Sequence, residues 1–104
     1  MNNETRLENG LKPKHQQEIE AIIKQQKNVE SVWLFGSRAM GTYKDSSDID
    51  LVVKGSELTL SDLEKILTKL ELTTIPYKVD ILIKHKINNP ELLEHIEKFG
   101  IRWI

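Results

Sequence analysis

The stretch Leu34–Val53, LFGSRAMGTYKDSSDIDLVV, contains the pattern that decides both the fold and the chemistry of this chain. Apolar residues lie at both of its ends, and the pair Gly36-Ser37 follows the first apolar run. Asp48 and Asp50 lie in the second run, although aspartate is depleted in β-strands. Residues two apart on a strand point to the same side, about 6–7 Å from one another at the backbone. The stretch therefore predicts two neighbouring carboxylates on one strand face.

Two such carboxylates have a structural and a functional interpretation. Unpaired, they repel one another, and burying either costs several kcal/mol, so a purely structural pair needs cationic partners or full exposure to water. The functional interpretation needs a divalent cation, and Mg²⁺ is commonly held by one or two carboxylates together with substrate phosphates. A solvated turn is the alternative to a catalytic role for Asp48 and Asp50.

A third carboxylate, Asp80, lies inside another apolar run, Lys78–Lys84 (KVDILIK). If this strand pairs beside the strand Asp48–Lys54, Asp80 can reach the same place. Three carboxylates could hold two Mg²⁺ ions about 3.5–4 Å apart, the arrangement that supports phosphoryl or nucleotidyl transfer. The alternative for Asp80 is an aspartate on an edge strand that faces water.

The residues after the first strand supply groups for binding phosphate. Gly36 has no Cβ, so a phosphate can approach the backbone closely. Ser37 can cap a short helix, whose free N–H groups form an anion site, or its hydroxyl can bind a phosphate oxygen. Arg38 adds a cation that could contact a phosphate or form a structural salt bridge.

Two other ligand-binding loops do not fit the same stretch. Gly36 and Gly41 have the glycine spacing of a P-loop, but Thr42-Tyr43 stands where Lys-Ser/Thr is required. The segment after Asp45 resembles a calcium loop, but glycine is missing from the sixth position.

The remaining pattern predicts an α/β (α+β) domain with a small mixed sheet and helices packed on one face. Strands are expected at Val29–Phe35, Asp48–Lys54 and Lys78–Lys84, and helices after Pro13, around Leu63–Leu70 and from Pro90 to Gly100. Thr59 with Asp62, or Ser61 with Glu64, could cap the second helix. The final residues, GIRWI, could be a last strand or a docking tail. We expect a flexible N-terminus over 1–11 and one domain over 12–104.

Composition excludes several classes of protein. The chain has 104 residues, no cysteine and a formal net charge of −1. Without cysteine there is neither a disulfide framework nor a thiolate metal site, which fits a reducing cytoplasm. The mixed charge shows no basic stripe, so we expect no strong direct binding of nucleic acid. Neither a signal peptide nor a membrane span is indicated.

Together, Gly36-Ser37, Asp48-x-Asp50 ten residues later and the distal Asp80 resemble the nucleotidyltransferase superfamily of DNA polymerase β. On so short a chain, the pattern is similar to the minimal nucleotidyltransferases, the MNT family, whose members commonly act as antitoxins beside a HEPN-domain toxin. The resemblance implies the polymerase β-like fold, two Mg²⁺ held by the three aspartates, and ATP held at Gly36 and Ser37. In one departure, Met40 replaces an arginine that is common in the family, which puts the supporting role of that position in doubt.

The resemblance further implies transfer of AMP from ATP to a tyrosine hydroxyl of a HEPN-type RNase toxin, with Asp80 helping to deprotonate the acceptor. The partner would then be bound in a hetero-oligomer, partly through the apolar tail Phe99–Ile104. Two alternatives stay open. The chain could be an antitoxin that neutralises its partner by binding alone, with an inactive or nucleotide-sensing site. It could also be a stand-alone transferase acting on a small-molecule hydroxyl.

Overall fold

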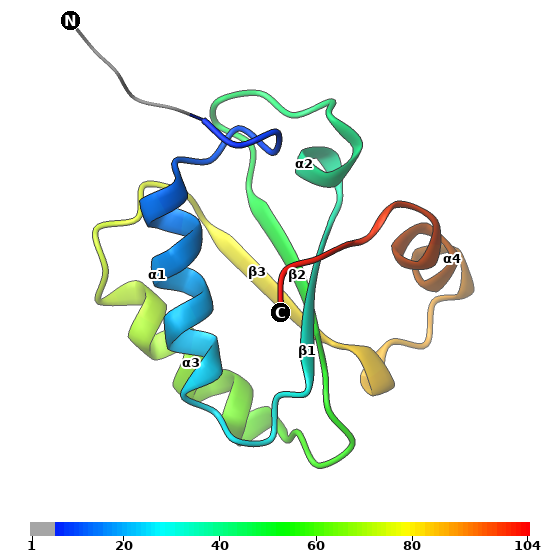
Figure 1. Cartoon of the computed structure of the whole chain (residues 1–104). Coiled ribbons are helices and arrows are strands. Elements are labelled where there is room, and N and C mark those ends of the chain that lie inside the picture. Colours follow the sequence, from blue (N-terminus) through cyan, green and yellow to red (C-terminus); the bar gives the residue numbers. More distant parts are fainter. Residues whose placement is uncertain (1–5) are drawn as a thin grey trace, which may run out of the picture.

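Four strands form one mixed sheet in the computed structural model, which describes residues 6–104 (Figure 1). The order across the sheet is β3-β2-β1-β4. Strand β1 pairs antiparallel with β2 and with β4, and β2 pairs parallel with β3. A parallel pair needs a crossover connection, which helix α3 provides between β2 and β3. The strands are β1 (Ser31–Phe35), β2 (Ile49–Lys54), β3 (Val79–Ile83) and β4 (Ile101–Arg102).

The helices begin where the sequence carries capping residues. Thr59 and Asp62 form the predicted capping box at the start of α3, each side chain accepting a hydrogen bond from the backbone N–H of the other residue. Asn89 accepts hydrogen bonds from two backbone N–H groups in the first turn of α4, and Pro90 occupies the first helical position. The helices are α1 (Pro13–Lys24), α2 (Ser37–Met40), α3 (Leu60–Glu71) and α4 (Pro90–Phe99), with a short 3₁₀ turn, η1 (Lys84–Lys86), after β3.

Helices cover both faces of the sheet, which corrects the expectation of a single covered face. Helices α1 and α3 pack over the main core, to which β2 contributes Ile49, Leu51 and Val53. Helix α4 packs on the opposite face, where Ile96 meets Phe35 and Val52 (Figure 1). This second cover follows from the sequence of the strands, because both sides of β1 and β2 carry large apolar residues that need burial.

Both ends of the described chain pack against the body of the protein. Of the expected flexible segment 1–11, residues 1–5 lie outside the described part, whereas Leu11 is fully buried in the main core. The packed structure therefore begins before residue 12. At the other end, the backbone N–H groups of Trp103 and Ile104 donate to the carbonyl of Val32, and both side chains pack against the main core. The last residues thus close the protein's own core, while Ile101 is 47% exposed.

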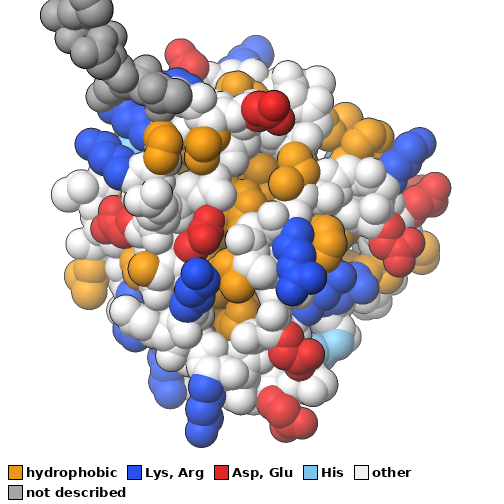
Figure 2. Space-filling view, in the orientation of Figure 1, with side chains coloured by type: hydrophobic (Ala, Val, Ile, Leu, Met, Phe, Trp, Pro, Cys, Tyr) orange, Lys and Arg blue, Asp and Glu red, His pale blue; other side chains and the backbone are white. Residues whose placement is uncertain are grey.

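Charged side chains of both signs are interspersed on the face shown in Figure 2. This distribution agrees with the mixed charge of the sequence. Among residues 6–104, no helix is long and apolar enough to cross a membrane.

Candidate active site

Asp50 and Asp80 lie side by side on neighbouring strands. They are partners in the parallel register of β2 and β3, so their side chains share one face of the sheet, the face on which α4 packs. Asp48 is exposed and lies just before β2, which begins at Ile49 rather than at Asp48 as predicted. The structure therefore pairs Asp50 with Asp80 and places Asp48 at the entrance to the strand.

Electrostatic crowding is concentrated on Asp50. Burial raises the pKa of the Asp50 carboxyl above its ordinary value, and the neighbouring carboxylates of Asp80 and Asp48 raise it further, while His95 and Lys78 oppose the shift. Asp80 has a cationic neighbour, with its Oδ1 atom 3.5 Å from Nζ of Lys78, in a pair that is largely exposed. An exposed pair of this kind contributes little to stability. The charge most in need of a counter-ion is therefore that of Asp50.

The carboxylates of Asp48, Asp50 and Asp80 suit Mg²⁺ chemically but do not by themselves form a complete coordination shell. All three side chains offer hard carboxylate oxygens, and the raised pKa of Asp50 shows that its negative charge lacks full compensation. Within the described residues, no group of three or more His, Cys, Asp or Glu side chains is arranged closely enough to hold a metal ion. Mg²⁺ commonly completes its coordination with substrate phosphates and water, so one or two of these carboxylates are sufficient protein ligands.

Gly36 meets the carboxylate of Asp50 at the end of β1. Its φ of +74° is in the left-handed region that favours glycine. A Cβ atom at this position would overlap the Asp50 carboxylate. Any other residue would therefore strain the backbone and push Asp50 out of place. The sequence predicted a glycine that permits close approach, and the structure shows that one of the groups approaching it is Asp50.

Ser37 begins the short helix α2 rather than capping it. Gly36 is the N-cap residue, and no side chain makes a capping hydrogen bond. The backbone carbonyl of Gly36 accepts hydrogen bonds from the N–H groups of Ala39 and Met40. The Ser37 hydroxyl, half-buried beside the site, has no hydrogen-bond partner among residues 6–104. It is therefore available for a ligand.

Arg38 is placed differently from the expectation of a direct contact with nucleotide. Its side chain is 2% exposed, and all three guanidinium nitrogens donate to backbone carbonyls, those of Asn9, Asp45 and Ser47. Its Cζ atom also lies 4.7 Å from the ring centroid of Tyr77, a cation–π distance. Arg38 therefore fastens the N-terminal segment and the loop before β2 to the body of the protein. In this conformation it has no accessible face for a phosphate.

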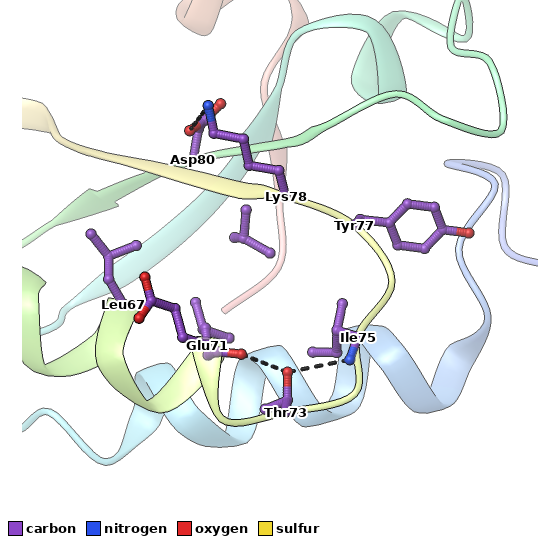
Figure 3. Close-up of a pocket in the computed structure, with 9 residues that line it drawn as sticks. Leu67, Glu71, Thr73, Ile75, Tyr77, Lys78 and Asp80 are labelled. Atoms are coloured by element: carbon purple, nitrogen blue, oxygen red, sulfur yellow. Dashed lines mark hydrogen bonds and ion pairs between the residues drawn. The ribbon is translucent and has the colours of Figure 1, made fainter.

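Two adjoining cavities open beside the carboxylates. The first, which we call the carboxylate cavity, has a volume of about 380 Å³ and is lined by Phe35, Asp50, Leu67, Val79, Asp80, Ile81 and Leu82. The second, the β3-edge cavity, has a volume of about 360 Å³; its apolar walls are Leu67, Leu70, Ile75, Tyr77 and Val79, and Asp80 lies at one end (Figure 3). The two cavities share Leu67, Val79 and Asp80, so the carboxylates lie next to a space with both apolar and polar walls.

Comparison with known families identifies the family of this chain. The family described as "Polymerase beta, Nucleotidyltransferase" matches residues 17–102, a range that includes every site residue described above. The chain belongs to this nucleotidyltransferase family. The predicted fold class is confirmed, as is the resemblance to the minimal nucleotidyltransferases.

Several proteins and solved structures are similar to this nucleotidyltransferase. MJ1217 of Methanocaldococcus jannaschii, named as a protein adenylyltransferase, is 36% identical over 81 residues, which cover 74% of this chain and 79% of the relative. The solved structure of a minimal nucleotidyltransferase is 27% identical, with a TM-score of 0.66, and the match covers 96% of this chain and 98% of that one. The tri-AMPylated HEPN toxin of Shewanella oneidensis in complex with MNT antitoxin matches with a TM-score of 0.63 at 19% identity, over 85% of this chain and 68% of that one. At that identity, the last comparison shows the fold alone.

Sequence reasoning missed one contact of the nucleotidyltransferase site. His95 lies on α4, and its Nε2 atom accepts a hydrogen bond of 3.1 Å from the backbone N–H of Gly36. Its ring packs between Phe35 and Phe99, with centroid distances of 6.2 Å and 5.2 Å. The contact joins residues 59 positions apart. No local signal in the sequence indicates it, because it depends on how α4 docks on the sheet.

Proposed function

We propose that this nucleotidyltransferase transfers AMP from ATP to a tyrosine hydroxyl of a HEPN-type toxin and thereby acts as its antitoxin, with Mg²⁺ as cofactor. The observation that carries the proposal is the row formed by Gly36 just after β1, Asp50 on β2 and Asp80 on β3. Gly36 abuts Asp50, and Asp50 is paired with Asp80. This row has the hydroxyl of Ser37, unpaired within residues 6–104, next to one end and the carboxylate of Asp80 at the other.

In the proposed reaction, the triphosphate lies at Gly36 and Ser37, where the free Ser37 hydroxyl can donate to a phosphate oxygen. Asp48, Asp50 and Asp80 would hold Mg²⁺, which when bound supplies positive charge to the phosphates and to the developing negative charge. The acceptor oxygen forms a bond to the α-phosphorus as the bond from the α-phosphorus to its bridging oxygen breaks. Pyrophosphate leaves with the electron pair, and Asp80 takes the proton of the hydroxyl.

AMP as the transferred group and protein as the acceptor are supported by the relatives. Those from Methanocaldococcus jannaschii carry the name of protein adenylyltransferases, and one structure of the same fold is that of a toxin–antitoxin with AMP-PNP, with a TM-score of 0.70 at 22% identity. Another contains an AMPylated HEPN toxin. Support for tyrosine as the acceptor comes from the family resemblance.

The test combines this protein with ATP, Mg²⁺ and a HEPN-type toxin as candidate partner, and measures the intact mass of that partner. We expect the partner to gain one or more AMP units and to lose its RNase activity. The matched variants are Asp50→Asn, which removes a proposed ligand, and Asp45→Asn, which removes an exposed carboxylate outside the site. Only the first should abolish transfer.

Two other outcomes would contradict the enzymatic proposal in different ways. Formation of a complex that silences the toxin with no gain in mass would indicate an antitoxin that acts by binding alone. Neither a complex nor a gain in mass would favour transfer to a small-molecule hydroxyl.

A further inference from the structure

We propose that the free edge of β3 and the β3-edge cavity together bind the acceptor segment of the partner protein. The segment would lie extended along β3, with the acceptor hydroxyl beside Asp80 and an adjacent apolar side chain in the cavity. This inference rests on the proposed transfer to a protein hydroxyl. It specifies the surface that binds that protein and the type of side chain expected next to the acceptor residue.

The direction of approach follows from the order of groups across the sheet. Gly36, at the end of β1, lies on one side of Asp50, and Asp80, on β3, lies on the other. In a phosphoryl or nucleotidyl transfer, the attacking and leaving oxygens are roughly in line. With the leaving pyrophosphate at Gly36 and Ser37, the attacking hydroxyl must come from the β3 side. The β3-edge cavity opens on this side, with Asp80 at its end.

Strand β3 is at the end of the sheet and is accessible to another strand. Among residues 6–104 it pairs with β2 alone. The carbonyl of Lys78 accepts a hydrogen bond from the N–H of Ile49 in β2. Because backbone groups alternate in direction along a strand, those of Val79 are directed to the open edge. An extended peptide can add to such an edge, with affinity from main-chain hydrogen bonds and specificity from pockets for alternate side chains.

The two faces of β3 offer different surroundings to such a peptide. Asp80 is on the face where α4 packs, and the cavity lies between β3 and α3 on the other side of the ribbon, with Ile75 and Leu67 projecting into it (Figure 3). Successive side chains of an extended segment point to opposite faces. One segment can therefore place a hydroxyl at Asp80 and its neighbour in the cavity. Because the side chains that project into the cavity are apolar, that neighbour should be apolar, whereas the exposed Lys78 and Glu71 suit polar flanking residues.

The cavity is tested by filling it. Ile75→Trp adds bulk to its wall, and Thr74→Trp adds the same side chain at the adjacent exposed position, which does not line the cavity. The probe is the HEPN-type partner that gains AMP in the test of the proposed function, with its affinity measured without ATP and its KM measured during transfer. We expect Ile75→Trp to lower the affinity for the partner and to raise the KM for the partner, each by about ten-fold, which is the effect of losing one buried anchor. The affinity for ATP should change by less than about two-fold. Thr74→Trp should resemble the wild type.

The strand edge is tested separately, which keeps the proposal falsifiable if Ile75→Trp does not fold. Val79→Pro removes the outward N–H group, and Val79→Ala removes the same side chain but keeps that group. At matched melting temperatures, the proline variant should bind the partner more weakly than the alanine variant.

Three results would overturn the inference. Loss of ATP affinity in Ile75→Trp with unchanged acceptor KM would assign the cavity to the nucleoside instead. Unchanged acceptor binding in Ile75→Trp would mean that the cavity is not part of the acceptor site. Equal binding by the two Val79 variants would mean that the edge of β3 is not part of it. Failure of the proposed function is distinguishable, because the wild type itself would then transfer no AMP.

Discussion

Replacing Asp50 with asparagine should abolish transfer and at the same time make the ligand-free protein more stable. Burial and the carboxylates of Asp80 and Asp48 together raise the pKa of Asp50, so its charged form is disfavoured in the folded protein. Asparagine has nearly the same shape and removes this charge. After a discount for solvent screening of a partly exposed group, we expect a gain of about 0.5–1 kcal/mol in the free energy of unfolding at pH 7. For a domain of this size, that gain raises the melting temperature by roughly 2–8 °C.

The pH dependence of this gain identifies its cause. A carboxyl whose folded pKa is raised stabilises the fold at low pH, and loses that contribution as pH rises through the folded pKa. Below the unfolded pKa of about 3.9, Asp50 is protonated in both states, so asparagine has no advantage there. Thermal unfolding of the wild type, Asp50→Asn and the exposed control Asp45→Asn should be followed from pH 3.5 to pH 7.5, roughly the range in which such carboxyls titrate. The difference between Asp50→Asn and the wild type should grow with pH, and the control should show little difference.

Addition of Mg²⁺ and ATP should make the wild type more stable than Asp50→Asn. Ligands that bind only the folded state stabilise it, and of the two proteins the wild type alone retains the Asp50 carboxylate as a ligand. A ligand-free Asp50→Asn protein that is less stable than the wild type at pH 7 would refute the reasoning. It would mean that the Asp50 carboxylate makes a net favourable interaction in the folded state.

Three further predictions concern residues around the site. His95→Leu removes the acceptor of the Gly36 N–H group, so it should cost about 1 kcal/mol of stability and lower kcat. His95→Gln can still accept this hydrogen bond and should recover part of both losses. Equal loss in the two variants would contradict a role for the hydrogen bond. Arg38→Met should lower the free energy of unfolding by about 2–4 kcal/mol, because the backbone carbonyls of Asn9, Asp45 and Ser47 lose the buried guanidinium that donates to them. A raised KM for ATP at unchanged stability would instead indicate direct phosphate binding. Deletion of 102–104 should unfold the protein in circular dichroism, because Trp103 and Ile104 complete the main core; a folded truncated protein that no longer binds its partner would show that the tail is an interface.

Features that depend on near neighbours in the chain could be predicted from the sequence. The alternation in Ile49–Lys54 depends on a period of two residues, and the caps at Thr59 and Asn89 depend on contacts two or three residues away. The aspartates are candidates because their residue type is out of place in apolar strands, and the Gly36-Ser37 pair is a candidate because it follows a strand end and can approach or bind a phosphate. The boundaries were less accurate, since β2 begins one residue after Asp48. Local propensity says little about where a strand starts.

Features that join distant segments were decided only by the tertiary structure. The local sequence around Arg38 does not show whether its guanidinium donates to a phosphate or to three backbone carbonyls. Only the path of the chain brings Asn9 to Arg38, 29 positions away. The same is true of His95 and Gly36, and of the cavity between α3 and β3. The sequence by itself determined which residues are candidates for the site and which strands they lie on or beside, because side-chain type and alternation are local properties. Which carboxylates become partners, which cation is buried and where a second molecule can enter depend on helix docking and strand order, which arise from burying apolar surface over the whole chain.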